Sequence, residues 1–317
     1  MSHVEHLKEL HGLPAFDFAR FAEKRELPEA GAAAWWLAVE PYGDSPQDFG
    51  DLWDRFLDSV DPAGVRAIIV GQWGEPYDND SSGIVRRLVD ARDRLTSLRA
   101  VFIGDLEMEE AEISWIEQSD VTPVLEAYPL LEEFGIRGGT GLRFPAVRHE
   151  HLRTLRFEAG GLPGEVVRGV AASELPALEH LDLWLGVEEY GGDAGVADLA
   201  PILAGGRFPA LRHLGLRNSE IQDEVATAVA GAPVVAQLTS LDLSLGVLTD
   251  EGATALLGGQ PLTHLTRLDL HHNFLSEPVV ERIRTALEPS GVETDLSERG
   301  EVWEDDGVVH RFTAVAE

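Results

Sequence analysis

The 317-residue sequence predicts an α/β solenoid, in which parallel strands line a concave face and α-helices cover the convex face. Three observations lead to this fold class. A six-residue apolar pattern recurs along the chain, a turn and a helical pattern follow its copies, and successive copies begin 21 to 33 residues apart. Internal periods of this length are typical of stacked repeat proteins.

The repeated pattern is L-x-x-L-x-L, with apolar residues at its first, fourth and sixth positions. Its eight copies begin at Val65, Leu98, Leu131, Leu152, Leu178, Leu211, Leu238 and Leu265. The last copy continues as LTRLDLHHNFL, which is the full leucine-rich-repeat pattern with Asn273 at the asparagine position. We therefore predict a leucine-rich-repeat solenoid over residues 61–298.

Helical patterns follow the later copies. Segments such as GVADLAPILAG, EIQDEVATAVAG and SEPVVERIRTALE have apolar residues three and four positions apart, and most end in glycine. Each repeat is therefore a strand, a turn and a helix, and strands joined in this way run parallel. Repeats near 27 residues with full helices resemble those of the ribonuclease-inhibitor type, over residues 61–298.

The two ends of the chain need caps, because a solenoid exposes its apolar interior and a sheet edge at each terminus. Residues 1–60 are predicted to be an N-terminal capping region with one β/α unit, a strand in AAAWWLAVEP and a helix in DFGDLWDRFLDSV. Residues 299–317 contain two extended runs around an Asp-Gly turn signal. We expect an acidic C-terminal hairpin that closes the far edge of the sheet, or an acidic tail.

The composition excludes several classes of partner. A formal net charge of −31 repels phosphate backbones and anionic lipids, so we expect neither nucleic acid nor a membrane as partner. The chain has no cysteine, which excludes disulfides and thiolate metal sites. Its start lacks the pattern of a signal peptide, and no apolar run is long enough for a membrane span. A soluble, acidic, cytoplasmic protein without a cofactor is expected.

Inner-face residues follow from strand alternation: the third, fifth and seventh positions of each copy point away from the leucines, onto the concave surface. These positions are apolar or small in the first copies and polar in the later ones. Asp242 and Asp269 should lie side by side, and Arg217 and Arg267 should offset their repulsion. The predicted partner-binding residues are His180, Asp182, Trp184, His213, Arg217, Asp242, Arg267, Asp269 and His271.

Trp184 is expected to stand exposed on this surface, because it occupies a seventh position. Tryptophan beside arginine is typical of binding hot spots. The alternative is that the following EEYGGDAG loop folds back and covers the ring.

The sequence contains no motif of a hydrolase nucleophile, a phosphate-binding loop or a zinc protease. We therefore predict a non-catalytic protein–protein interaction scaffold that binds its partner, a protein with a basic patch, on the concave face. The alternative is a metal-assisted or acid/base enzyme that uses Asp182, Asp242, Asp269 and His271. No metal is expected there, because a flat ladder of strands points its side chains in parallel, whereas metal ligands converge.

The combination of VGQWGE, EISWIEQSD, RGGTGL, LDLWLG with EYGGDA, and LDLHHNFLS resembles a bacterial, largely actinobacterial, family of leucine-rich-repeat proteins, over nearly the whole chain. The resemblance implies a cytoplasmic solenoid encoded alongside radical-SAM and ATP-grasp-type enzymes, and so a partner or substrate-handling module for such an enzyme. It implies no catalytic residues.

Overall fold

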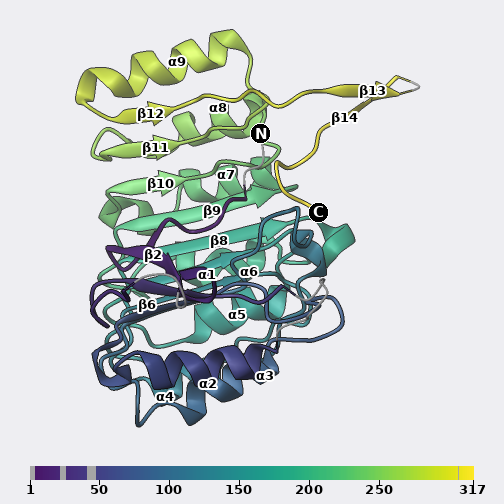
Figure 1. Ribbon diagram of the computed structural model, residues 1–317. Helices are drawn as coiled ribbons and strands as arrows, with labels where there is room; N and C mark the ends of the chain where they lie inside the picture. The colour runs from purple at the N-terminus through teal and green to yellow at the C-terminus, as the bar shows by residue number, and fades with distance from the viewer. Residues whose placement is uncertain (1–3, 22–25, 41–47, 306) are drawn as a thin grey trace.

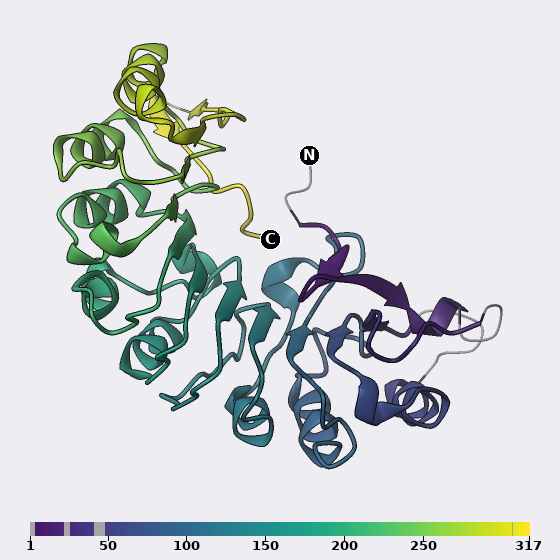
Figure 2. The ribbon, with the colours of Figure 1, turned by 90° about the vertical axis from the view of Figure 1, so that its left-hand side faces the viewer.

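The computed structural model describes residues 4–21, 26–40, 48–305 and 307–317. Within this part of the chain, strands line the concave side of a curved solenoid and helices cover its convex side (Figure 1, Figure 2). The predicted leucine-rich-repeat solenoid is confirmed.

The sheet contains twelve strands in the described residues, and their order in the sheet follows their order in the chain. The first two strands are antiparallel, and all later neighbours are parallel. The strands are β1 (Glu9–Leu10), β2 (Leu13–Asp17), β3 (Ala34–Leu37), β4 (Ala67–Val70), β5 (Ala100–Ile103), β6 (Glu133–Arg137), β7 (Thr154–Glu158), β8 (His180–Gly186), β9 (His213–Ser219), β10 (Ser240–Asp242), β11 (Arg267–Asp269) and β12 (Glu293–Asp295). The eight copies of the repeat pattern supply β4 to β11.

The described residues form nine α-helices, of which α2 to α9 cover the convex side of the sheet and the short α1 follows β2 at its N-terminal end. They are α1 (Phe18–Phe21), α2 (Phe49–Ser59), α3 (Ser82–Asp90), α4 (Thr122–Ala127), α5 (Gly164–Ala172), α6 (Val196–Leu203), α7 (Gln222–Ala230), α8 (Asp250–Gly258) and α9 (Glu277–Leu287). Short 3₁₀ helices occupy Pro62–Gly64, Ile113–Trp115, Glu188–Tyr190, Pro233–Gln237 and Glu288–Ser290. Side-chain caps begin several helices, α2 and α8 among them: Asp48 accepts from the Asp51 amide at α2, and Thr249 accepts from the Glu251 amide at α8.

The main hydrophobic core lies between the sheet and the helix layer. Leu178, Leu181 and Leu183 of one repeat are completely buried, and the same positions of neighbouring repeats pack against them. Burial of each leucine contributes roughly 1.5–3 kcal/mol. Asn273 ends the last full copy as the repeat pattern requires: its buried side chain donates to the Leu270 carbonyl and accepts from the Leu275 amide.

A second, smaller apolar cluster lies on the concave face. The N-terminal residues fold across the inner side of β3 to β5, where Figure 2 shows them within the curve of the solenoid. Its buried members are Leu10, Ala34, Ala67, Ile69, Ala100 and Phe102. The predicted capping region thus holds the expected β/α unit, β3 and α2, together with an unexpected β1–β2 hairpin that covers the apolar part of the inner face.

The C-terminal region forms a hairpin that projects away from the sheet (Figure 1), with β13 (Trp303–Asp305) paired to β14 (Val308–His310). The hairpin is a separate sheet, so β12 remains the far edge and the predicted closure is not found. Beyond the hairpin the chain returns to the solenoid. The Ala314 amide donates to the Leu245 carbonyl, and the side chain of Asn218 bonds both backbone groups of Val315.

No helix in the described ranges is both long and apolar enough to cross a membrane.

Candidate functional site

Parallel pairing brings the polar inner-face residues of β7 to β11 into register. Asp242 pairs with Asp269, as predicted, and His180 pairs with His213. We name this strip the polar inner face. It comprises Thr154, Arg156, His180, Asp182, His213, Arg217, Ser240, Asp242, Arg267, Asp269 and His271.

Trp184 does not contribute to this surface as predicted. Only 4% of the residue is exposed, and it belongs to the main hydrophobic core. The guanidinium of Arg217 lies over its ring, 5.1 Å from the ring centroid. The expectation of an exposed hot-spot tryptophan is therefore wrong.

Strand alternation places Trp184 beside Arg217 on the concave side, but other segments cover the carboxyl end of β8. The loop after β8 turns back, and its Val187 amide donates to the Gly160 carbonyl. The C-terminal segment approaches from the other direction, and a side chain at Gly160 would collide with the Ala316 carbonyl. The alternative prediction, that the EEYGGDAG loop folds back, thus describes this end of the sheet better. The C-terminal segment contributes to the cover as well.

The three aspartates of the polar inner face are buried, although we expected them to be exposed. Asp182, Asp242 and Asp269 are 4%, 7% and 6% exposed. Arg217 forms ion pairs with both Asp182 (3.3 Å) and Asp242 (3.2 Å), and Arg267 pairs with Asp269 (2.8 Å). The two arginines offset the carboxylate repulsion as predicted.

Burial and pairing shift the pKa values of these groups in opposite directions. Burial raises the pKa of Asp242 to about 6, although Arg217 opposes the shift. Burial also disfavours the charge of Asp269, but hydrogen bonds from His271 and Arg267 outweigh it and hold the pKa of this carboxyl below its usual value. The same hydrogen bond, 2.7 Å long, raises the pKa of His271.

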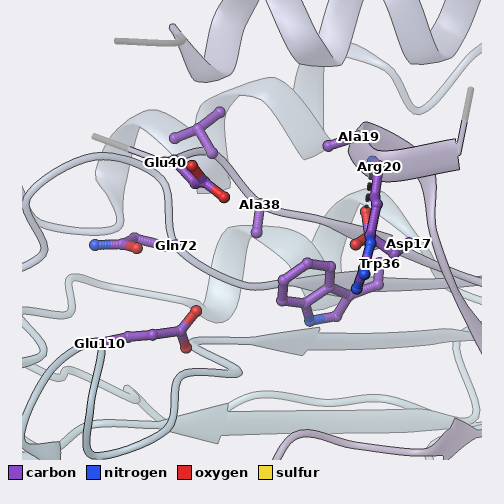
Figure 3. A pocket seen from close by; sticks show the side chains of 9 residues that line it. Asp17, Ala19, Arg20, Trp36, Ala38, Glu40, Gln72 and Glu110 are labelled. Carbon is purple, nitrogen blue, oxygen red and sulfur yellow. Dashed lines mark hydrogen bonds between the residues drawn. The ribbon is translucent and has the colours of Figure 1, made fainter. Parts of the chain in front are cut away.

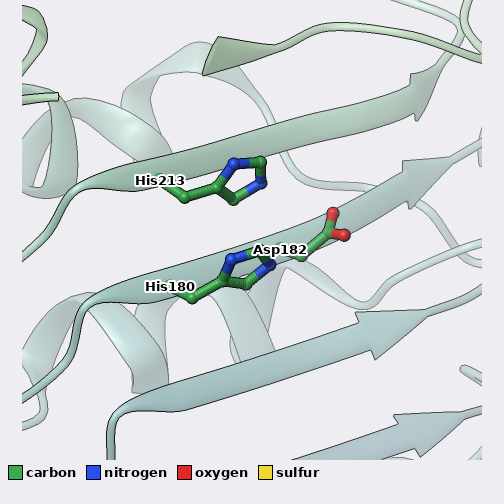
Figure 4. A group of neighbouring side chains, drawn as sticks. All are labelled: His180, Asp182 and His213. Atoms are coloured by element: carbon green, nitrogen blue, oxygen red, sulfur yellow. The ribbon is translucent and has the colours of Figure 1, made fainter. Parts of the chain in front are cut away.

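Two histidines form the centre of the strip. The rings of His180 and His213 stack with centroids 3.9 Å apart and an interplanar angle of 7°. Burial, helped by the neighbouring His213 ring, lowers the pKa of His180 to about 4, so this ring is neutral near pH 7. Together with Asp182 the two histidines offer donor atoms that all lie within 4.8 Å of one another (Figure 4).

The four residues of the alternative enzyme hypothesis do not form one cluster. In the described residues, groups that could hold a metal ion are His180, Asp182 and His213, and separately Asp269, His271 and Asp295. Asp242 belongs to neither group, because its carboxylate faces Arg217.

Two arginines of the inner face were not predicted as functional residues. Arg156 pairs in register with Asp182, and its buried Nε lacks a hydrogen-bond partner among the described residues. Arg137 is 3% exposed and binds Glu158 (2.8 Å), Asp105 (3.4 Å) and the Glu5 carbonyl (3.0 Å). Both occupy inner-face positions of the repeat pattern, and this position is the sequence feature by which they could have been identified.

A hollow of about 490 Å³ lies at the N-terminal end of the solenoid (Figure 3). Its lining includes Asp17, Arg20, Trp36, Glu40, Gln72 and Glu110. The indole nitrogen of Trp36 donates to Asp105 at 2.8 Å. None of the predicted partner-binding residues lines this hollow.

Comparison with known proteins found similar solved structures. No protein-family model matches the chain, and no curated protein matches it. A crystal structure of a Bacteroides fragilis protein, a structural genomics target, is similar to it with a TM-score of 0.74 and 35% sequence identity. The match covers 79% of this chain and 70% of the other. The chain therefore belongs to the same family as this Bacteroides fragilis protein.

Proposed function

We propose that the chain is a non-catalytic protein–protein interaction scaffold whose partner binds the polar inner face. One observation carries the proposal: the chain covers the apolar part of its own concave surface and leaves the polar part partly exposed. Residues near Leu10 bury Ala67, Ile69 and Phe102 on the first strands. On the later strands Arg156, His180, His213, Arg217, Arg267 and His271 all keep partial exposure.

The geometry of the strip supports binding because its side chains are already fixed. Arg217 is held by two carboxylates, and Arg267 contacts Asp269 (2.8 Å) and Glu293 (2.8 Å). A partner that binds here orders few additional side chains, so the entropic cost of association is small. Parallel strands of a solenoid supply the rigid frame.

Charge supports a partner with a basic patch. The net charge of −31 attracts a cationic protein over a distance comparable to the Debye length, about 8–10 Å at physiological salt. Because the aspartates of the strip are buried, this attraction comes from the net charge of the whole molecule. The association rate should therefore fall as salt rises.

A pair of matched substitutions tests this proposal. Thr154→Arg places a long side chain on β7, in register with His180, and Thr227→Arg places the same side chain on the exposed face of α7. Wild type and Thr227→Arg should capture the same partner protein equally from a lysate of the native host. Thr154→Arg should no longer capture that protein.

Quantitative mass spectrometry of the three captures gives the readout, with circular dichroism to confirm that both variants fold. The proposal fails if every captured protein binds Thr154→Arg as strongly as Thr227→Arg, or if nothing is captured above background.

A further inference from the structure

We propose that His180, His213 and Asp182 bind one divalent transition-metal ion, such as Zn²⁺, on the polar inner face. This inference goes beyond the scaffold function and does not depend on it. The sequence alone predicts no metal ion on this face, Asp182 included, because a flat ladder of strands points its side chains in parallel. The stacked histidine pair brings a different set of donors together.

Donor placement is the first support. One nitrogen of each imidazole and one carboxylate oxygen of Asp182 lie within 4.8 Å of one another. Figure 4 shows the two rings side by side, with the carboxylate beyond their outer ends. Bonds of about 2.0–2.2 Å to a common ion bring such donors closer than this. Modest rotation of the two partly exposed imidazoles supplies that approach.

The hydrogen bonds leave suitable atoms available. Nδ1 of His213 shares a hydrogen bond with the Ser240 hydroxyl at 3.0 Å, so its Nε2 is available as a ligand. A partner on the second ring nitrogen is the usual arrangement for a metal-binding histidine, because it fixes the ring. No hydrogen bond to either ring nitrogen of His180 is found in the described ranges, and the ring contact is the stack on His213.

The carboxylate of Asp182 gives an independent indication of a missing ligand. Only 4% of this residue is exposed, yet its Oδ1 has no hydrogen-bond partner among the described residues. The other oxygen pairs with Arg217. A buried carboxylate oxygen without a partner is costly, and a bound cation would satisfy it. Gly215 preserves the space, because a side chain there would collide with Oδ1.

The donor set selects the class of ion. Two imidazole nitrogens and one carboxylate oxygen suit Zn²⁺, Co²⁺ or Ni²⁺ better than Mg²⁺ or Ca²⁺, which prefer oxygen ligands. Three protein ligands leave at least one position for water or for a donor from outside. The nearby Arg217 guanidinium repels a cation, so we expect affinity below that of a closed structural zinc site.

Isothermal titration calorimetry of chelator-treated protein with ZnCl₂ tests the site, and the visible absorption of Co²⁺ reports its coordination. We expect about one ion per chain and no binding of MgCl₂ or CaCl₂. His180→Ala and His213→Ala should each weaken binding at least tenfold, and Ser240→Ala, which frees the His213 ring, about tenfold.

His271→Ala is the matched control, because His271 belongs to the neighbouring Asp269 and Asp295 group. It should leave Zn²⁺ affinity unchanged. His213→Gln repeats the test with a side chain of similar size, and circular dichroism checks that each variant folds. The proposal is overturned if wild type binds no Zn²⁺, if His213→Ala and His213→Gln bind as wild type does, or if only His271→Ala loses binding.

Discussion

Replacing Trp184 by alanine should lower the free energy of unfolding by about 3–5 kcal/mol, the usual cost of truncating a large buried aromatic. The side chain is 4% exposed and packs within the main core, so its removal leaves a cavity at the carboxyl end of β8. The contact with Arg217, 5.1 Å from the ring centroid, is lost as well. A cation–π contact in a desolvated setting contributes on the order of 1–2 kcal/mol, which places the expected value in the upper half of the range.

Urea denaturation followed by far-ultraviolet circular dichroism measures this change. Trp115→Ala is the matched control, because the same side chain is removed from a residue that is 54% exposed. It should change the free energy of unfolding by no more than about 0.5 kcal/mol. Equal effects of the two substitutions, or a loss below about 1 kcal/mol for Trp184→Ala, would refute the assignment of Trp184 to the core.

Two further predictions concern buried charges. Arg137→Met removes the cation between buried Asp105 and Glu158. In the same urea assay it should lower the free energy of unfolding by about 3–5 kcal/mol, and a loss below about 1 kcal/mol would contradict the role of these ion pairs. Asp242 has a pKa raised to about 6, above its value of about 3.9 in an unfolded chain, so its ionisation destabilises the fold progressively as pH rises from 4 to above 6. Asp242→Asn should therefore gain about 2 kcal/mol relative to wild type between pH 4 and pH 7.5, and a difference that does not change with pH would exclude this role.

The strands and their register could be predicted because the repeat pattern is local and strict. Each copy places three apolar residues against the helix layer, and a shift by one residue would turn them to the concave face. Every copy therefore pairs in the same alignment as its neighbours. This is why the adjacency of Asp242 to Asp269 followed from the sequence alone, and the same alignment pairs His180 with His213.

Exposure on the inner face could not be predicted, because it depends on segments remote in the chain. Arg137 binds the Glu5 carbonyl across 132 residues, and Asn218 holds Val315 across 97. No periodic pattern marks either terminus as a cover for the concave face. The burial of the aspartates has a different cause, because it depends on how the long side chains of Arg217 and Arg267 pair with them across neighbouring strands.

The two termini also explain why the accessible strip lies where it does. Without the N-terminal residues, Ala67, Ile69, Ala100 and Phe102 would form an apolar patch on the concave face, and patches of this kind promote association. At the carboxyl end of β9, the C-terminal segment lies beside Asn218. A ligand of the concave face must therefore bind between these two covers, over β7 to β11, where the stacked histidines and the paired arginines are the side chains that it meets first.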